Sequence, residues 1–176
     1  MKLNNKRTIL VGLAFLSICA FWQMYDSIVP LILTKTFHMN ETFSGAIMAA
    51  DNILALFLLP FFGSVSDKSH SKLGKRMPFI LFGTGCAIIL MNILPLLDNS
   101  YAAQPSGFKT ASFVIVLGLL LVAMGTYRAP AVALMPDVTP KPLRSRANAI
   151  INLMGAVGGI LYLGVAAVLY PNSKPA

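Results

Sequence analysis

The sequence predicts an all-α integral membrane protein with five transmembrane helices. Of its 176 residues, 56% are apolar and 11% are charged, whereas about a quarter of a soluble domain is charged. The mean hydropathy is +0.73. The apolar residues lie in five runs of 19 to 26 residues, and about 20 residues are needed to cross the hydrocarbon layer. Runs this long and apolar on every side exclude a β-barrel, whose strands are about 10 residues of alternating pattern.

The five runs are interpreted as one transmembrane domain that covers residues 1–176. The first is one long helix and not a signal peptide, because no small-residue cleavage pattern follows Cys19. The second is interrupted by Asp51 and Asn52, the third ends near Pro95, and the fourth carries Arg128 towards its far end. The predicted spans are residues 8–33, 43–62, 79–97, 111–134 and 147–170.

Basic residues in the connections predict how the chain is oriented. With the N-terminus inside, the inner segments hold ten lysines and arginines and the outer segments hold three, out of fourteen. Cytoplasmic loops of membrane proteins carry such an excess, so we expect a cell-membrane protein with a cytoplasmic N-terminus and a C-terminus outside. The same loops account for the net charge of +8 without a nucleic-acid partner. The lipid bilayer is the expected environment.

Two carboxyl groups lie inside predicted spans, where an ionised side chain is costly unless it faces a cavity or a partner. At a rise of 1.5 Å per residue, Asp26 and Asp51 lie at similar depth, roughly 10–12 Å below the outer surface. Two carboxyls at one depth suggest a site that takes up and releases a proton or a sodium ion. The alternative is that either aspartate pairs with a buried polar group and holds two helices together.

A candidate substrate site combines residues of the first and fourth spans. Trp22, Gln23 and Asp26 share one helix face, and an aromatic ring beside an amide and an acid suits a sugar, although a packed interface has the same pattern. The flat guanidinium of Arg128 suits a carboxylate or sugar hydroxyls. Its alternative is to reach the inner surface, about six residues away by the apolar pattern.

Other features indicate packing, and no catalytic or metal site is expected. Gly155 and Gly159 form a G-x-x-x-G pattern in the fifth span, which allows close approach of another helix. Both histidines, His38 and His70, lie in connections without further ligands. No cluster of catalytic type is present, so neither an enzyme nor a cofactor is expected.

The polar stretch from Gly63 to Phe79 carries the most specific motif. Gly63-Ser-Val-Ser-Asp67-Lys68, followed by Lys72, Gly74, Lys75 and Arg76, resembles the signature between helices two and three of the major facilitator superfamily. The run Gly74-Lys-Arg-Met-Pro-Phe-Ile80 resembles the glycoside–pentoside–hexuronide:cation symporters and the related sucrose transporters. A second block, from Arg128 to Thr139 and from Arg144 to Asn148, is similar to the fourth helix and following loop of that group.

The resemblance implies a secondary active transporter that carries a sugar-like solute together with a proton or sodium ion. It implies cation coupling by Asp51 and Asn52, whose helix is similar to the group's cation-site helix. It also implies a cavity lined by the first and fourth helices. Gly63, Asp67, Lys68 and Arg76 would control the conformational change, with Arg76 a plausible partner of Asp67.

The chain departs from the family in length, because the family has twelve spans in two halves of six helices. Five spans correspond to an incomplete N-terminal half. Three explanations follow: a fragment of a longer transporter, one chain of a split transporter, or a small structural or regulatory membrane protein that does not transport. The first two require the missing C-terminal half or another chain as a partner.

Overall fold

The computed structural model describes residues 5–72 and 74–169, with the side chains of residues 5–7 and of Asp51 left out. The charges of Lys2, Lys6, Arg7 and Lys174, the Asp51 carboxyl, and the last predicted span residue, Tyr170, therefore lie outside the described part. Five α-helices are long and apolar enough to cross a membrane, which confirms the predicted all-α, multi-pass architecture. They are α1 (Asn5–Lys35), α2 (Glu41–Lys68), α3 (Met77–Ala103), α4 (Gly107–Val138) and α5 (Arg144–Leu169), with a 3₁₀ turn, η1 (Lys141–Leu143).

The helices begin before the predicted spans, and the first four also end after them. Helix α2 continues six residues past Phe62, so Gly63, Asp67 and Lys68 lie on its last turns and not in a loop. Helix α4 likewise continues through Pro136 to Val138, into the stretch predicted as a connection. Hydropathy marks where the run of apolar side chains ends, whereas helical hydrogen bonding continues until the backbone leaves the helical conformation. Lys68 in the last turn of α2 also suits the negative end of the helix dipole.

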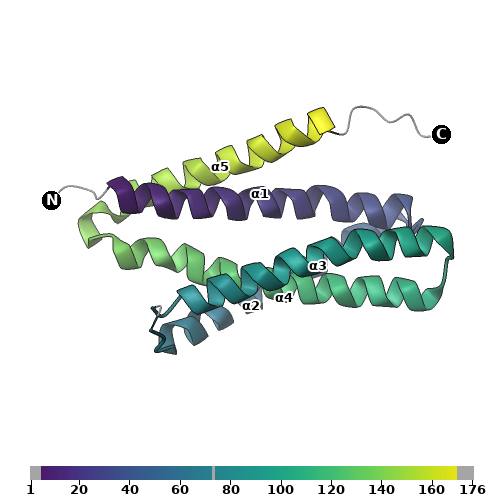
Figure 1. Cartoon of the computed structure of the whole chain (residues 1–176), viewed down its shortest axis with the longest axis horizontal. Helices are drawn as coiled ribbons and strands as arrows, with labels where there is room; N and C mark the ends of the chain where they lie inside the picture. The colour runs from purple at the N-terminus through teal and green to yellow at the C-terminus, as the bar shows by residue number, and fades with distance from the viewer. Residues whose placement is uncertain (1–4, 73, 170–176) are drawn as a thin grey trace. The chain divides into compact units, whose positions relative to one another are not determined.

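The chain divides into two compact units, and the first contains residues 1–28 and 134–176. Within it, α5 packs against the N-terminal half of α1 (Figure 1). A buried apolar cluster joins the two helices to the end of α4, through Val11, Met135, Ala147 and Ile151. This small core positions the turn between α4 and α5.

Glycines of α5 make the close approach of α1 and α5 possible. A Cβ atom at Gly155 would lie 2.9 Å from the Cys19 sulfur, and one at Gly158 would overlap the backbone of Leu16. The packing role expected for the glycine pattern is therefore present, with one correction. The tightest position is Gly158, whereas a Cβ at Gly159 would make an ordinary contact of 3.7 Å with the Gln23 side chain.

The second unit contains residues 29–133, and α4 supplies more of its buried side chains than any other helix. Helices α3 and α4 approach closely at Gly83, where an added Cβ would lie 2.9 Å from the backbone nitrogen of Tyr127. Helix α2 contacts α4 where Leu58 lies beside Gly125. Within this unit, the fully buried side chains along α4 include Phe113, Leu117, Leu120, Leu121, Met124 and Pro130.

Aromatic rings hold the connection between α1 and α2 to this second unit. Phe37 lies in that connection, and its ring centroid is 4.2 Å from that of Tyr101 on α3 and 4.6 Å from that of Phe113 on α4. Aromatic pairs at these separations are favourable beyond the apolar area that they bury. The connection is therefore fixed to two helices rather than only to the ends that it joins.

Candidate functional site

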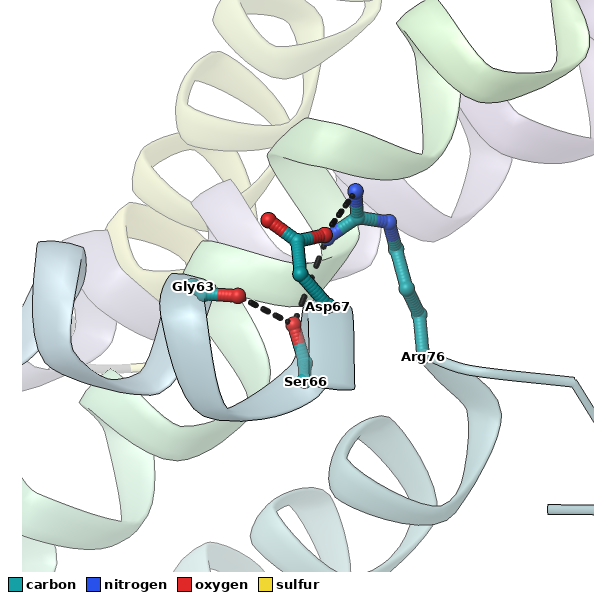
Figure 2. Close-up of polar contacts among 4 residues, drawn as sticks. All are labelled: Gly63, Ser66, Asp67 and Arg76. Atoms are coloured by element: carbon teal, nitrogen blue, oxygen red, sulfur yellow. Dashed lines mark hydrogen bonds and ion pairs between the residues drawn. The ribbon is translucent and has the colours of Figure 1, made fainter. Parts of the chain in front are cut away.

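An ion pair joins the end of α2 to the start of α3. A terminal nitrogen of Arg76 (Nη2) lies 2.8 Å from Oδ1 of Asp67 (Figure 2). Asp67 is on the last turn of α2, and Arg76 directly precedes α3. The structure thus contains the pairing that the sequence motif suggested.

Ser66 extends this pair into a chain of hydrogen bonds. The other terminal nitrogen of Arg76 donates to the Ser66 hydroxyl at 3.3 Å, and that hydroxyl donates to the carbonyl of Gly63 at 2.8 Å (Figure 2). Ser66 is completely buried and the Arg76 side chain is 9% exposed, whereas the Asp67 side chain is 60% exposed. We call Gly63, Ser66, Asp67 and Arg76 the α2-end cluster.

The cluster differs from the predicted site in two residues. Ser66 was not among the predicted residues, although its place directly before Asp67 in the Ser-Asp-Lys motif was a signal for it. Lys68 is exposed and, within the part of the chain that the structure describes, makes no ion pair, so it does not join the cluster. Consecutive residues of a helix point about 100° apart, so Asp67 and Lys68 cannot both face one partner.

The short connection between α2 and α3 is what returns Arg76 to the end of α2. It contains a turn in which the Gly74 backbone nitrogen donates to the Ser71 carbonyl at 3.0 Å. Gly74 has a φ of +97°, a region that side chains with a Cβ rarely adopt. The glycine of the motif therefore has a local structural purpose: it allows the chain to reverse within a few residues.

The contribution of the ion pair can be measured with a double-mutant cycle. We expect a coupling of about 0.5–1 kcal/mol between Asp67→Asn and Arg76→Gln in the free energy of unfolding, because one partner is largely exposed. Arg76→Gln by itself should cost more, about 1–3 kcal/mol, because it also removes the donor to the buried Ser66 hydroxyl, which keeps only its bond to Gly63. Unfolding in mixed micelles, followed by circular dichroism, gives these values.

The matched control is Lys75→Gln, which removes the same charge from the neighbouring, exposed residue. An exposed side chain of this kind usually changes stability by less than about 0.5 kcal/mol. Equal losses for Lys75→Gln and Arg76→Gln would show that total loop charge, and not the cluster, sets the stability.

The predicted substrate residues of α1 lie in the first unit. Trp22 and Gln23 are half-buried, and the Trp22 ring is tilted by 46° against Tyr25, with centroids 6.2 Å apart. The Gln23 carbonyl accepts a hydrogen bond from the Ser27 hydroxyl at 2.7 Å. Asp26 is exposed on the same helix. These three residues come from neighbouring turns, as the spacing predicted, but they are not equally buried.

The predicted residues of α2 and α4 lie in the second unit. The Asn52 side chain is exposed and donates to the Met48 carbonyl at 3.0 Å, one turn earlier. Arg128 is half-buried, and α4 continues ten residues beyond it, to Val138. The end of the helix is thus ten residues away, whereas the distance from Arg128 to the membrane surface stays a prediction. Among the described residues, no group of three histidine, cysteine, aspartate or glutamate side chains could hold a metal ion.

Comparison with known proteins assigns the family. The model of the Major Facilitator Superfamily matches residues 11–173. The chain belongs to this superfamily of membrane transporters. It is 35% identical to sucrose transport protein SUC3 of Arabidopsis thaliana over 80% of its own length and 25% of the relative's. It is 36% identical to sucrose transport protein SUT3 of Oryza sativa subsp. indica, over 80% of its own length and 30% of the relative's.

These matches confirm the resemblance to the sucrose-transporter-like group within the superfamily. The chain spans about a quarter to a third of the length of these curated relatives. No solved structure matches it significantly. Membership of the superfamily is thus assigned from the sequence. The helical architecture described above fits part of the superfamily fold.

Proposed function

We propose that this chain forms part of a secondary active transporter that carries sucrose or a related sugar together with a cation. The observation that carries the proposal is the identity of 35–36%, over 80% of the chain, to proteins named sucrose transport proteins. Trp22, Gln23, Asp26 and Arg128 are the proposed sugar-binding residues. An aromatic face, together with amide, carboxylate and guanidinium groups, offers both the apolar contact and the hydrogen bonds that a sugar requires.

The coupling ion is proposed to be a proton or a sodium ion, held by Asp51 with Asn52 and assisted by Asp26. A carboxylate within a spanning helix is costly, and neutralisation by a cation removes that cost. Movement of the ion down its gradient then drives movement of the sugar. The α2-end cluster is proposed to hold one conformation of the transporter, because its ion pair links the ends of two helices and can be broken and remade.

We propose that further transmembrane helices, in the same polypeptide or in another chain, pack against these five to complete the transporter. Helix α2 leaves several large apolar side chains exposed, among them Phe43, Leu56 and Phe57, which lipid or further helices would cover. The excess of basic residues in alternate connections supports a cell-membrane protein with a cytoplasmic N-terminus.

Accumulation of labelled sucrose in sealed vesicles that contain the full-length protein tests this function. We expect accumulation when either a proton or a sodium gradient is imposed, and loss of accumulation when the matching ionophore dissipates that gradient. Competition with unlabelled sugars then defines the solute. Sucrose uptake that ignores both gradients would contradict symport, and the absence of any sugar uptake would favour a non-transporting membrane protein.

A further inference from the structure

A cavity of about 330 Å³ lies at the turn between α4 and α5, and none of the proposed sugar-binding or cation-coupling residues lines it. Its lining comes entirely from the first unit: Met135, Pro136, Arg144, Ser145 and Asn148. The two apolar residues lie on the last turns of α4. The three polar residues lie on the first two turns of α5. The cavity thus has one apolar wall and one wall of hydrogen-bonding groups.

One residue of the polar wall, Arg144, is held by a hydrogen bond to the turn. The Nε atom of Arg144 donates to the Thr139 carbonyl at 3.3 Å, which holds the guanidinium beside the turn. Within residues 5–72 and 74–169, the terminal nitrogens of Arg144 and the side chains of Ser145 and Asn148 make no other hydrogen bond or ion pair. An anion in the cavity could therefore accept bonds from a guanidinium, a hydroxyl and an amide.

The charge around the cavity also favours an anion. Residues 135–148 contain Lys141, Arg144 and Arg146 but a single acidic residue, Asp137. Lys141 and Arg146 are exposed, as is Arg144, but only Arg144 lines the cavity. The side chains of Lys141 and Arg146 raise the local positive potential, and among the basic residues of the turn only Arg144 would contact a bound anion directly. Substitutions of Arg144 and of Lys141 can therefore distinguish binding in the pocket from general electrostatic attraction to the loop.

The apolar wall indicates what kind of anion fits. Met135 and Pro136 directly follow the predicted fourth span, on a helix long and apolar enough to cross a membrane, so we expect the cavity to lie near the membrane surface. Basic pockets between transmembrane helices at the membrane surface suit the headgroups of anionic lipids. A soluble phosphate would use the polar wall but not the apolar one.

We propose that this cavity binds the headgroup of an anionic phospholipid. Arg144, Ser145 and Asn148 bind the phosphate oxygens, and the exposed Pro136 contacts the glycerol and the first methylene groups, above the buried Met135. The lipid then joins the end of α4 to the start of α5. This inference concerns the surrounding membrane and does not depend on which solute the protein carries.

Lipid binding to the purified full-length protein tests the proposal by native mass spectrometry. The probes are dioleoylphosphatidylglycerol, the neutral dioleoylphosphatidylcholine and glycerol 3-phosphate. We expect the anionic lipid to bind at least about tenfold more tightly than the neutral one, and Arg144→Gln to weaken it by about tenfold, as expected for one lost charge-assisted bond. Asn148→Ala, which leaves the Arg144–Thr139 bond in place, should weaken it by about three- to fivefold.

Lys141→Gln is the matched control, because it removes the same charge from the same turn but not from the cavity lining. It should change the affinity by no more than about twofold. Equal losses for Lys141→Gln and Arg144→Gln would overturn the pocket in favour of diffuse attraction. Glycerol 3-phosphate that binds as tightly as the lipid and displaces it would show a site for free phosphate. Equal affinity for both lipids would also overturn the proposal. If Arg144→Gln fails to fold, the lipid affinity of Asn148→Ala decides the test.

Discussion

Replacing Asp51 with asparagine is expected to abolish cation-driven accumulation of sugar by the full-length protein while leaving its membrane insertion intact. A carboxylate can hold a proton or a sodium ion, whereas the amide carries no charge to neutralise. Removing an ionisable group from a spanning helix does not hinder insertion, because the neutral side chain is cheaper in the membrane. Accumulation of labelled sucrose under an imposed gradient should fall to the level of vesicles without the protein.

The control for this substitution is Glu41→Gln on the same helix. Glu41 is exposed in the first turn of α2, so the change removes the same charge away from the proposed cation site. Exchange of labelled for unlabelled sugar without a gradient should persist in Asp51→Asn, which separates loss of coupling from loss of sugar binding. Full gradient-driven accumulation by Asp51→Asn would exclude a coupling role for this residue.

Replacing Gly158 with alanine is expected to destabilise the packing of α1 against α5 by about 2–3 kcal/mol, near the upper end for overpacking substitutions. The added Cβ would meet the carbonyl oxygen of Leu16 and would lie 2.9 Å from its carbonyl carbon. These are backbone atoms, which cannot move aside as the end of a flexible side chain can. Unfolding of the purified protein in mixed micelles, followed by circular dichroism, measures the loss.

Gly164→Ala provides the comparison, because it makes the same change on the same helix with no atom within 4 Å of the added Cβ. Alanine has a higher helix propensity than glycine by up to about 1 kcal/mol, so this variant should be neutral or slightly more stable. If Gly158→Ala behaves in the same way, the close approach of the two helices is not required for stability.

The helix boundaries illustrate how much of the fold hydropathy can predict. The five apolar runs identified five helices, since a backbone surrounded by lipid must satisfy its own hydrogen bonds. The predicted span ends at Phe62, whereas α2 continues six residues further, because Gly63 to Lys68 are mostly polar but still helical. Hydropathy reports the environment of side chains, whereas the end of a helix depends on local capping and turn geometry.

The motif residues illustrate what could be predicted of the candidate site. The pattern around Asp67 and Arg76 was specific enough to assign the group and to suggest that the two residues pair. It did not single out Ser66, because a serine before an aspartate usually lies at a surface. Its complete burial follows from the return of Arg76 to the end of α2.

By itself, the sequence determined the membrane-protein class, the number of helices and the family, because composition and motif spacing are properties of the linear chain. Only the tertiary structure decided that Ser66 bridges Arg76 to Gly63, and that Gly158, not Gly159, lies tightest against α1. Both depend on the rotation of a helix about its axis and on its distance from a neighbour. Adjacent residues of a helix point about 100° apart. Residue spacing alone therefore cannot tell which of two nearby residues faces the partner helix.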